Sequence, residues 1–147
     1  TLEGSTWASP PARFEAGTPH ISGAIGLAKA SEFIMGLGLD HIAKLEDDLL
    51  RYATEQMSAV DGLRVIGTAP DKAGILSFVI DGVHAQDLGT LLDQQGVAIR
   101  TGHHCAQPAM AAFGLTATAR ASFGLYNTDE DIDRLVEATQ RAVTMLR

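Results

Sequence analysis

The single cysteine of the chain, Cys105, lies in a segment with several cationic or titratable side chains. Arg100 precedes it, and His103 and His104 stand directly before it. A thiol is a useful nucleophile only as the thiolate, which neighbouring Arg and protonated His side chains favour. Gly102 breaks the segment before the cysteine, so these residues predict a reactive thiol on a loop. On the residues alone, a small buried cysteine without a chemical role fits equally well.

Two arginines near this cysteine could bind an anionic ligand. Arg120 follows a polar run and precedes an alternating segment, and its guanidinium could grip a carboxylate through two parallel hydrogen bonds. Arg100 could hold the cysteine loop or contact a ligand. His103 and His104 could share a proton with the thiol or only hold the loop, and an ordinary surface role for Arg120 also stays open.

A third candidate feature is Gly17-Thr18-Pro19, which stands just ahead of a predicted helix. A hydroxyl and free backbone N–H groups at such a position suit an anion such as phosphate. Thr18 could also be a plain helix N-cap, and the two roles are compatible. His41 and His84 lie at predicted helix starts and are expected to be solvated or to cap those helices.

Composition narrows the class of protein. The chain has 147 residues, of which 46% are hydrophobic, enough for a globular domain with its own core. A net charge of -7 argues against nucleic acid or an anionic membrane as the main partner. One cysteine excludes an intrachain disulfide framework and fits a reducing cytoplasm, and no apolar run is long enough to span a bilayer.

The elements that would position these residues alternate between helix and strand. Helical spacing of apolar residues predicts a helix from Ile21 that ends at Gly36 and Gly38, and a second helix capped by Asp40. Thr128 and Asp131 resemble a capping box that opens the last helix, with Arg141 and Arg147 in its last turn. The remaining predicted elements are strands at 63–66, 75–80, 97–100 and 118–123 and a helix at 84–95. This order predicts an α+β (or α/β-type) small domain.

Three stretches carry a resemblance to a known family: Arg13–Pro19, Arg100–Pro108 and Arg120–Thr128. They resemble motifs of SufS-type (group II) cysteine desulfurases, which are PLP-dependent enzymes of the class V aminotransferase family. The resemblance covers nearly the whole chain in order. It implies the C-terminal domain of a fold-type I PLP-dependent transferase, with a small sheet covered by helices on one side. Residues 1–35 would then link to a large PLP domain, and residues 36–147 would form the small domain with the cysteine loop.

The resemblance also implies roles for individual residues. The family converts L-cysteine to L-alanine and leaves a persulfide on the cysteine that matches Cys105, with His104 beside it in the catalytic loop. Arg120 matches the arginine that binds the substrate carboxylate, and Arg100 is expected to bind substrate as well. Gly17 and Thr18 match the loop that reaches the PLP phosphate of the neighbouring subunit.

The family's partners and setting follow from the same resemblance. It implies a homodimer, a SufE- or SufU-type sulfur acceptor and a role in iron–sulfur cluster assembly. With the composition, the expectation is a cytoplasmic protein with no metal site and no nucleic-acid or membrane partner. The sequence does not identify which acceptor would be used.

The lysines of the chain bear on the cofactor. None of Lys29, Lys44 and Lys72 stands in the Ser-x-His-Lys-like setting that the family uses for its Schiff base. The chain also begins without methionine. We therefore expect a C-terminal piece of a longer enzyme, with the Schiff-base lysine upstream of Thr1 and no turnover by the piece alone.

Two alternatives stay open at this point. Selenocysteine lyase activity would use the same site, because selenium and sulfur present similar targets. A PLP-free module that carries sulfur or docks a partner would need only the intact thiol, which can form a persulfide by exchange. Group I desulfurases are disfavoured, because their cysteine lies in a longer mobile loop with a different motif.

Overall fold

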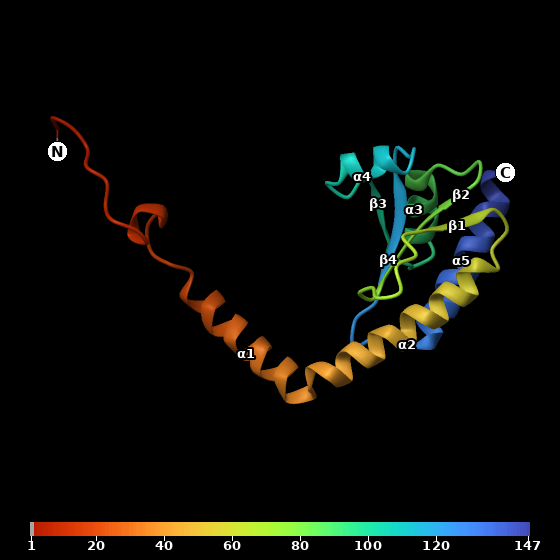
Figure 1. Ribbon diagram of the computed structural model, residues 1–147, viewed down its shortest axis with the longest axis horizontal. Helices are drawn as coiled ribbons and strands as arrows, with labels where there is room; N and C mark the ends of the chain where they lie inside the picture. Colours follow the sequence, from red (N-terminus) through yellow and green to blue (C-terminus); the bar gives the residue numbers. More distant parts are fainter. Residues whose placement is uncertain (1) are drawn as a thin grey trace. The chain divides into compact units, whose positions relative to one another are not determined.

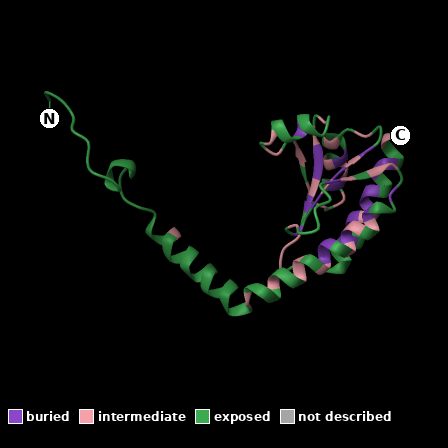
Figure 2. Ribbon diagram, in the orientation of Figure 1, coloured by how far each residue is buried: buried purple, intermediate pink, exposed green. Residues whose placement is uncertain are grey.

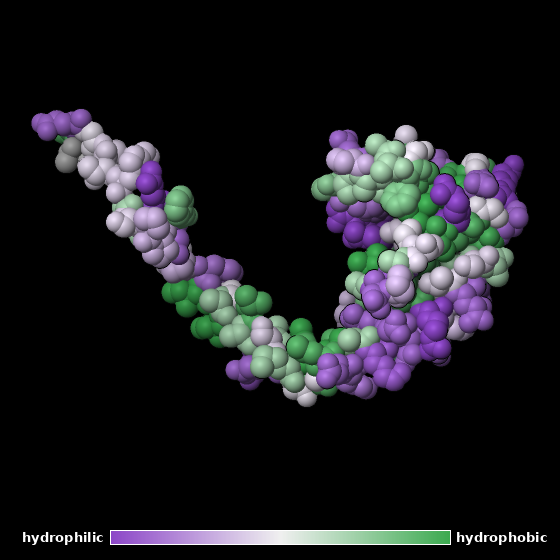
Figure 3. All heavy atoms as spheres, in the orientation of Figure 1, coloured by the Kyte–Doolittle hydropathy of each residue, from purple (hydrophilic) through white to green (hydrophobic). Residues whose placement is uncertain are grey.

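The computed structural model describes residues 2–147, which fall into two compact units, one reaching to Leu39 and one from Asp40 to Arg147 (Figure 1). The first unit holds a short 3-10 helix, η1 (Ala12–Phe14), and helix α1 (Ile21–Leu37). Helix α1 ends as predicted, at Gly38, whose φ of 88° is readily adopted only by glycine. No described residue of this unit up to Leu39 is buried, and Figure 3 shows apolar side chains along α1.

The second unit is a four-stranded antiparallel sheet with helices. Strands β1 (Leu63–Ile66) and β2 (Ile75–Ile80) have the predicted bounds, and β3 (Arg100–Gly102) and β4 (Thr118–Ser122) complete the sheet in the order β1-β2-β4-β3. The helices are α2 (Leu39–Ser58), α3 (Ala85–Asp93), α4 (Gln107–Ala112) and α5 (Asp129–Leu146). The predicted α+β class is confirmed. In the described residues, no helix is long and apolar enough to cross a membrane.

The core lies on one face of this sheet. The register sets Leu76 opposite Ala121 and Phe78 opposite Ala119, and all of these side chains are buried. Buried side chains from α2, α3 and α5 join them in a single cluster (Figure 2). Because side chains alternate across a strand, Arg120 and its neighbours on the adjacent strands belong to the opposite face.

The helix ends confirm one predicted cap and correct two other expectations. Thr128 and Asp131 form the predicted capping box of α5. Helix α2 already begins at Leu39, so Asp40 lies in its first turn and is not the cap, although its charge still suits the helix dipole there. Neither Arg141 nor Arg147 lies in the last turn of α5. Arg147 follows the helix and binds the Asp61 side chain, because the chain end lies beside the turn before β1.

The third strand was predicted in the wrong place. Residues 97–99 are outside the strands, and pairing with β4 begins only at Arg100. The reason is local: Gly96 has a φ of 76°, and the Val97 N–H still donates to the Leu92 carbonyl at 3.0 Å, so the chain is still leaving α3. Helix α3 begins at Ala85 because His84 caps it, with Nδ1 accepting from the Gln86 N–H at 3.3 Å, and it ends at Asp93, two residues earlier than predicted. His84 is thus a capping residue, as expected, and His41 is exposed.

Candidate active site

Strands β3 and β4 bring Arg100 and Arg120 side by side. The two residues are Cα partners in the antiparallel ladder, so their side chains start from the same face of the sheet. Within the described residues neither forms an ion pair, and the Arg120 Nε is buried without a hydrogen-bond partner. A buried, unpaired guanidinium N–H is costly, so this site favours an anionic ligand. Two adjacent guanidinium groups suit a carboxylate.

The cysteine loop connects β3 to α4 and presents Cys105 at the surface. Cys105 is a free, exposed cysteine, which excludes the alternative of a small buried cysteine packed in the core. His104 and Cys105 both have a positive φ, 55° and 57°. Non-glycine residues rarely adopt this conformation, and two in succession persist only where contacts hold them.

Three hydrogen bonds hold this loop. The Cys105 backbone N–H donates to His103 Nδ1 at 3.1 Å, and the Ala106 N–H donates to the His103 carbonyl at 2.8 Å. The third is made by His104, whose Nε2 lies 2.8 Å from the Thr118 Oγ1 and 3.2 Å from the Thr118 carbonyl oxygen. The first two bonds are local, whereas the third joins the loop to strand β4.

The contacts and surroundings of His104 bear on its protonation. A carbonyl oxygen only accepts, so His104 Nε2 carries the proton that it donates to Thr118. Burial and then the Arg120 guanidinium lower the pKa of His104 below its ordinary value of 6.5, which favours the neutral ring. Arg100 and Arg120 contribute positive charge beside the loop. The thiolate itself stays a prediction.

The predicted anion loop lies in the other unit. Gly17 and Thr18 are exposed and precede α1, and Gly17 has a φ of 78°. Thr18 is not the helix N-cap that was considered for it, because His20 occupies that position without a side-chain cap bond. The exposed hydroxyl of Thr18 is therefore not used in capping α1, and its contact with a phosphate stays a prediction.

Sequence reasoning missed Thr118 as a member of this site. It is fully buried, and both of its oxygen atoms face His104. A signal was available, because Thr118 stands two residues before Arg120 and strand alternation puts both on one face. The sequence does not indicate that the cysteine loop folds back far enough for His104 to reach Thr118.

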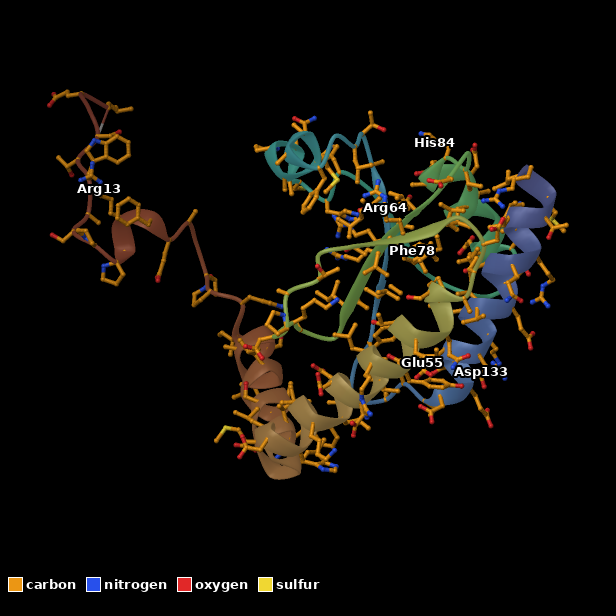
Figure 4. All side chains as sticks on the ribbon, turned by 45° about the vertical axis from the view of Figure 1, so that its right-hand side comes forward. Arg13, Glu55, Arg64, Phe78, His84 and Asp133 are labelled. Carbon is orange, nitrogen blue, oxygen red and sulfur yellow. The ribbon has the colours of Figure 1, made fainter. Side chains whose placement is uncertain are left out.

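A separate cleft of about 300 Å³ lies at the end of the sheet near the start of α3. Arg64, Phe78 and His84, labelled in Figure 4, line it together with the segment between α4 and β4. None of the predicted site residues lines this cleft. The candidate site is therefore the exposed cysteine loop and the arginine pair, with no part in this cleft.

Comparisons with known proteins match this chain to one family. Residues 1–135 match the sequence model of the family described as aminotransferase class-V. A probable cysteine desulfurase of Xylella fastidiosa (strain Temecula1 / ATCC 700964) is 47% identical over 146 residues, which are 99% of this chain and 35% of that protein. A cysteine desulfurase of Escherichia coli O127:H6 is 48% identical over 144 residues, which are 98% of this chain and 35% of that protein.

Solved structures of cysteine desulfurases are also similar to this chain. The crystal structure of the cysteine desulfurase CsdA (S-sulfonic acid) from Escherichia coli superposes with a TM-score of 0.87 at 37% identity, covering 100% of this chain and 36% of that chain. The apo structure of cysteine desulfurase from Thermococcus onnurineus NA1 gives a TM-score of 0.86 at 37% identity, covering 99% of this chain and 37% of that chain. The chain spans about a third of the length of the curated relatives that it matches.

Proposed function

The chain belongs to the class V aminotransferase family, and from this we propose that it is the cysteine-bearing part of a PLP-dependent cysteine desulfurase of the SufS type. The observation that carries the proposal is an exposed cysteine on a strained loop beside Arg100 and Arg120, two arginines that form no ion pair with the residues the structure describes. The names of relatives at 47% and 48% identity support the same activity.

The residues of this chain fit part of a PLP site. The Arg120 Nε lacks a partner, which suits the carboxylate of an amino-acid substrate, and Thr18 offers an exposed hydroxyl for the cofactor phosphate. The lysines do not fit a Schiff base: Lys29 binds Glu32, Lys44 binds Asp48, and Lys72 donates to the Gly67 carbonyl. We propose that the Schiff-base lysine lies in a part of the protein outside these residues.

PLP, when bound, would supply the electron sink for cleavage of the substrate C–S bond. Arg120, with Arg100 beside it, would hold the substrate carboxylate and so fix where the substrate sulfur lies. The Cys105 thiolate would attack that sulfur: an S–S bond forms, the C–S bond breaks, and its electron pair stays with the carbon that becomes the methyl group of L-alanine. Cys105 is left as a persulfide.

The surface position of Cys105 suits delivery of this sulfur to another protein. We propose an acceptor of the SufE or SufU type, iron–sulfur cluster assembly as the destination, a cytoplasmic setting, and a homodimer in which Gly17 and Thr18 serve the phosphate of the neighbouring subunit. These finer points rest on the resemblance of the motifs.

The test uses the full-length protein with PLP. We expect an imine absorbance band, and L-alanine and sulfide from L-cysteine in the presence of a reductant. Cys105→Ser should keep the band, which shows that it folds and binds PLP, and should lose sulfide release. Sulfide release by Cys105→Ser at the normal rate would refute the nucleophile. Persulfide formation on Cys105 only by exchange, with no imine band in the full-length protein, would instead favour a PLP-free sulfur carrier.

A further inference from the structure

Thr118 is an unusual residue for the interior of this unit. It and Thr139 are the buried polar side chains found among residues 2–147, and both are fully buried. The Thr139 hydroxyl donates to the Leu135 carbonyl within its own helix, α5, at 2.7 Å. Thr118 instead faces a residue of another segment, because its hydroxyl and its carbonyl both contact His104 Nε2. Thr139 is therefore a natural control for Thr118.

The contact joins the rigid part of the site to its strained part. Thr118 lies in β4, which pairs with both β2 and β3. His104 and Cys105 have left-handed backbone conformations that need external support. The hydrogen bonds of His103 lie within the loop and would move with it. Within the described residues, the hydrogen bond to Thr118 is the side-chain bond that ties the loop to the sheet.

We propose that Thr118 is a positioning residue, which holds His104 as the Nε2–H tautomer and thereby fixes the direction in which Cys105 presents its sulfur. This inference rests on the proposed function, since it concerns the same thiol. Strand β4 then carries both the residue that orients the nucleophile loop and Arg120, which would hold the substrate. One strand would set the distance between sulfur donor and acceptor, and His104 would serve as an anchor and not as a proton carrier.

The first experiment measures persulfide formation on Cys105 in a single turnover of the full-length, PLP-loaded protein. Thr118→Val keeps the side-chain shape but removes the hydroxyl, and we expect the rate to fall roughly tenfold, with KM for L-cysteine little changed. Thr118→Ser restores the hydroxyl and should stay within about twofold of wild type. Thr139→Val removes a matched buried hydroxyl from α5 and should leave the rate unchanged.

The second experiment does not depend on turnover. Nitrogen NMR of His104 should show the Nε2–H tautomer in wild type, and the Nε2 resonance should shift in Thr118→Val, which keeps the carbonyl but loses the hydroxyl contact, and not in Thr118→Ser. The rate at which iodoacetamide alkylates Cys105 is measured by mass spectrometry of the peptide that contains it. This rate should differ from wild type in Thr118→Val and should equal wild type in Thr139→Val. His104→Gln places an amide N–H near the Nε2 position, whereas His104→Asn places one near Nδ1. Only His104→Gln should keep the wild-type alkylation rate.

The outcomes separate this inference from the proposed function. If wild type forms the persulfide and Thr118→Val matches Thr139→Val in persulfide rate, His104 Nε2 resonance and alkylation rate, Thr118 does not position the loop. If Thr118→Val fails to fold, equal alkylation rates of the two His104 variants would overturn the inference. If PLP-loaded wild type forms no persulfide, the proposed function fails, while the tautomer and alkylation data still decide whether Thr118 anchors the loop.

Discussion

The contact between Gly89 and Thr101 offers a sharp test of how the site is held. A Cβ atom at Gly89 would lie 2.7 Å from the Thr101 Cγ2 and 3.5 Å from its Oγ1, so α3 approaches β3 too closely for alanine. The Thr101 hydroxyl also donates to the Gln86 Oε1 at 2.9 Å, which fastens the strand to the same helix. Thr101 stands between Arg100 and Gly102, directly before the cysteine loop. This contact therefore decides where the loop begins.

The two effects of Gly89→Ala have opposite signs. Alanine stabilises a helix interior by about 1 kcal/mol relative to glycine. Forcing a methyl group into a filled contact costs about 1–3 kcal/mol. With a mid-range cost of about 2 kcal/mol, Gly89→Ala should lower the free energy of unfolding by about 1 kcal/mol. Thr101→Ser removes the clashing Cγ2 and keeps the hydroxyl, so in the double variant the clash is relieved and the helix gain of the alanine should appear.

The assay is a double-mutant cycle by urea unfolding, followed by circular dichroism because the one tryptophan, Trp7, lies in the other unit. Wild type, Gly89→Ala, Thr101→Ser and the double variant are compared at constant m-value. We expect a favourable coupling energy of about 2 kcal/mol. If Gly89→Ala stabilises the chain by about 1 kcal/mol and the coupling is near zero, helix α3 does not press on Thr101 and the reasoning is wrong.

Two further predictions concern pH. Hydrogen bonds from Asn127 and from the Thr128 backbone lower the pKa of Asp131 below its ordinary 3.8, so its stabilising effect is present above that value and is lost as the pH falls through the lower folded pKa. Asp131→Ala should cost about 1 kcal/mol near neutral pH, and a urea-midpoint difference from wild type that persists undiminished in acid would contradict this. Burial and Arg120 lower the pKa of His104 below 6.5, so the folded chain should lose stability as the pH falls from that value through the folded pKa. His104→Gln should lack this slope, and an equal slope in both proteins would exclude His104 as its source.

The parts of the fold that could be predicted are those with local signals. Strands β1 and β2 are short apolar or alternating runs bounded by turn residues, and their bounds were predicted correctly. The capping box of α5 needs only Thr128 and Asp131 at the right spacing, and it formed as expected. In each case the residues that specify the structure lie within a few positions of it.

Strand β3 shows where local signals fail. The apolar residues Val97 and Ile99 pattern like a buried strand, yet the segment is still closing the end of α3 through the bond from Val97 to Leu92. The ladder starts at Arg100, where β4 comes within reach. A strand exists only where a partner is available, and the position of the partner is a tertiary property.

The charge around Cys105 could not be predicted for the same reason. Residue types alone place two histidines next to the thiol, but burial and Arg120 lower the pKa of His104, and its contact with Thr118 depends on the tertiary fold. If the histidines had supplied the positive charge, that charge would vanish as the pH rises through about 6.5. Arg100 and Arg120 stay charged throughout this range. The positive field that these two arginines contribute beside the loop is therefore constant at neutral pH.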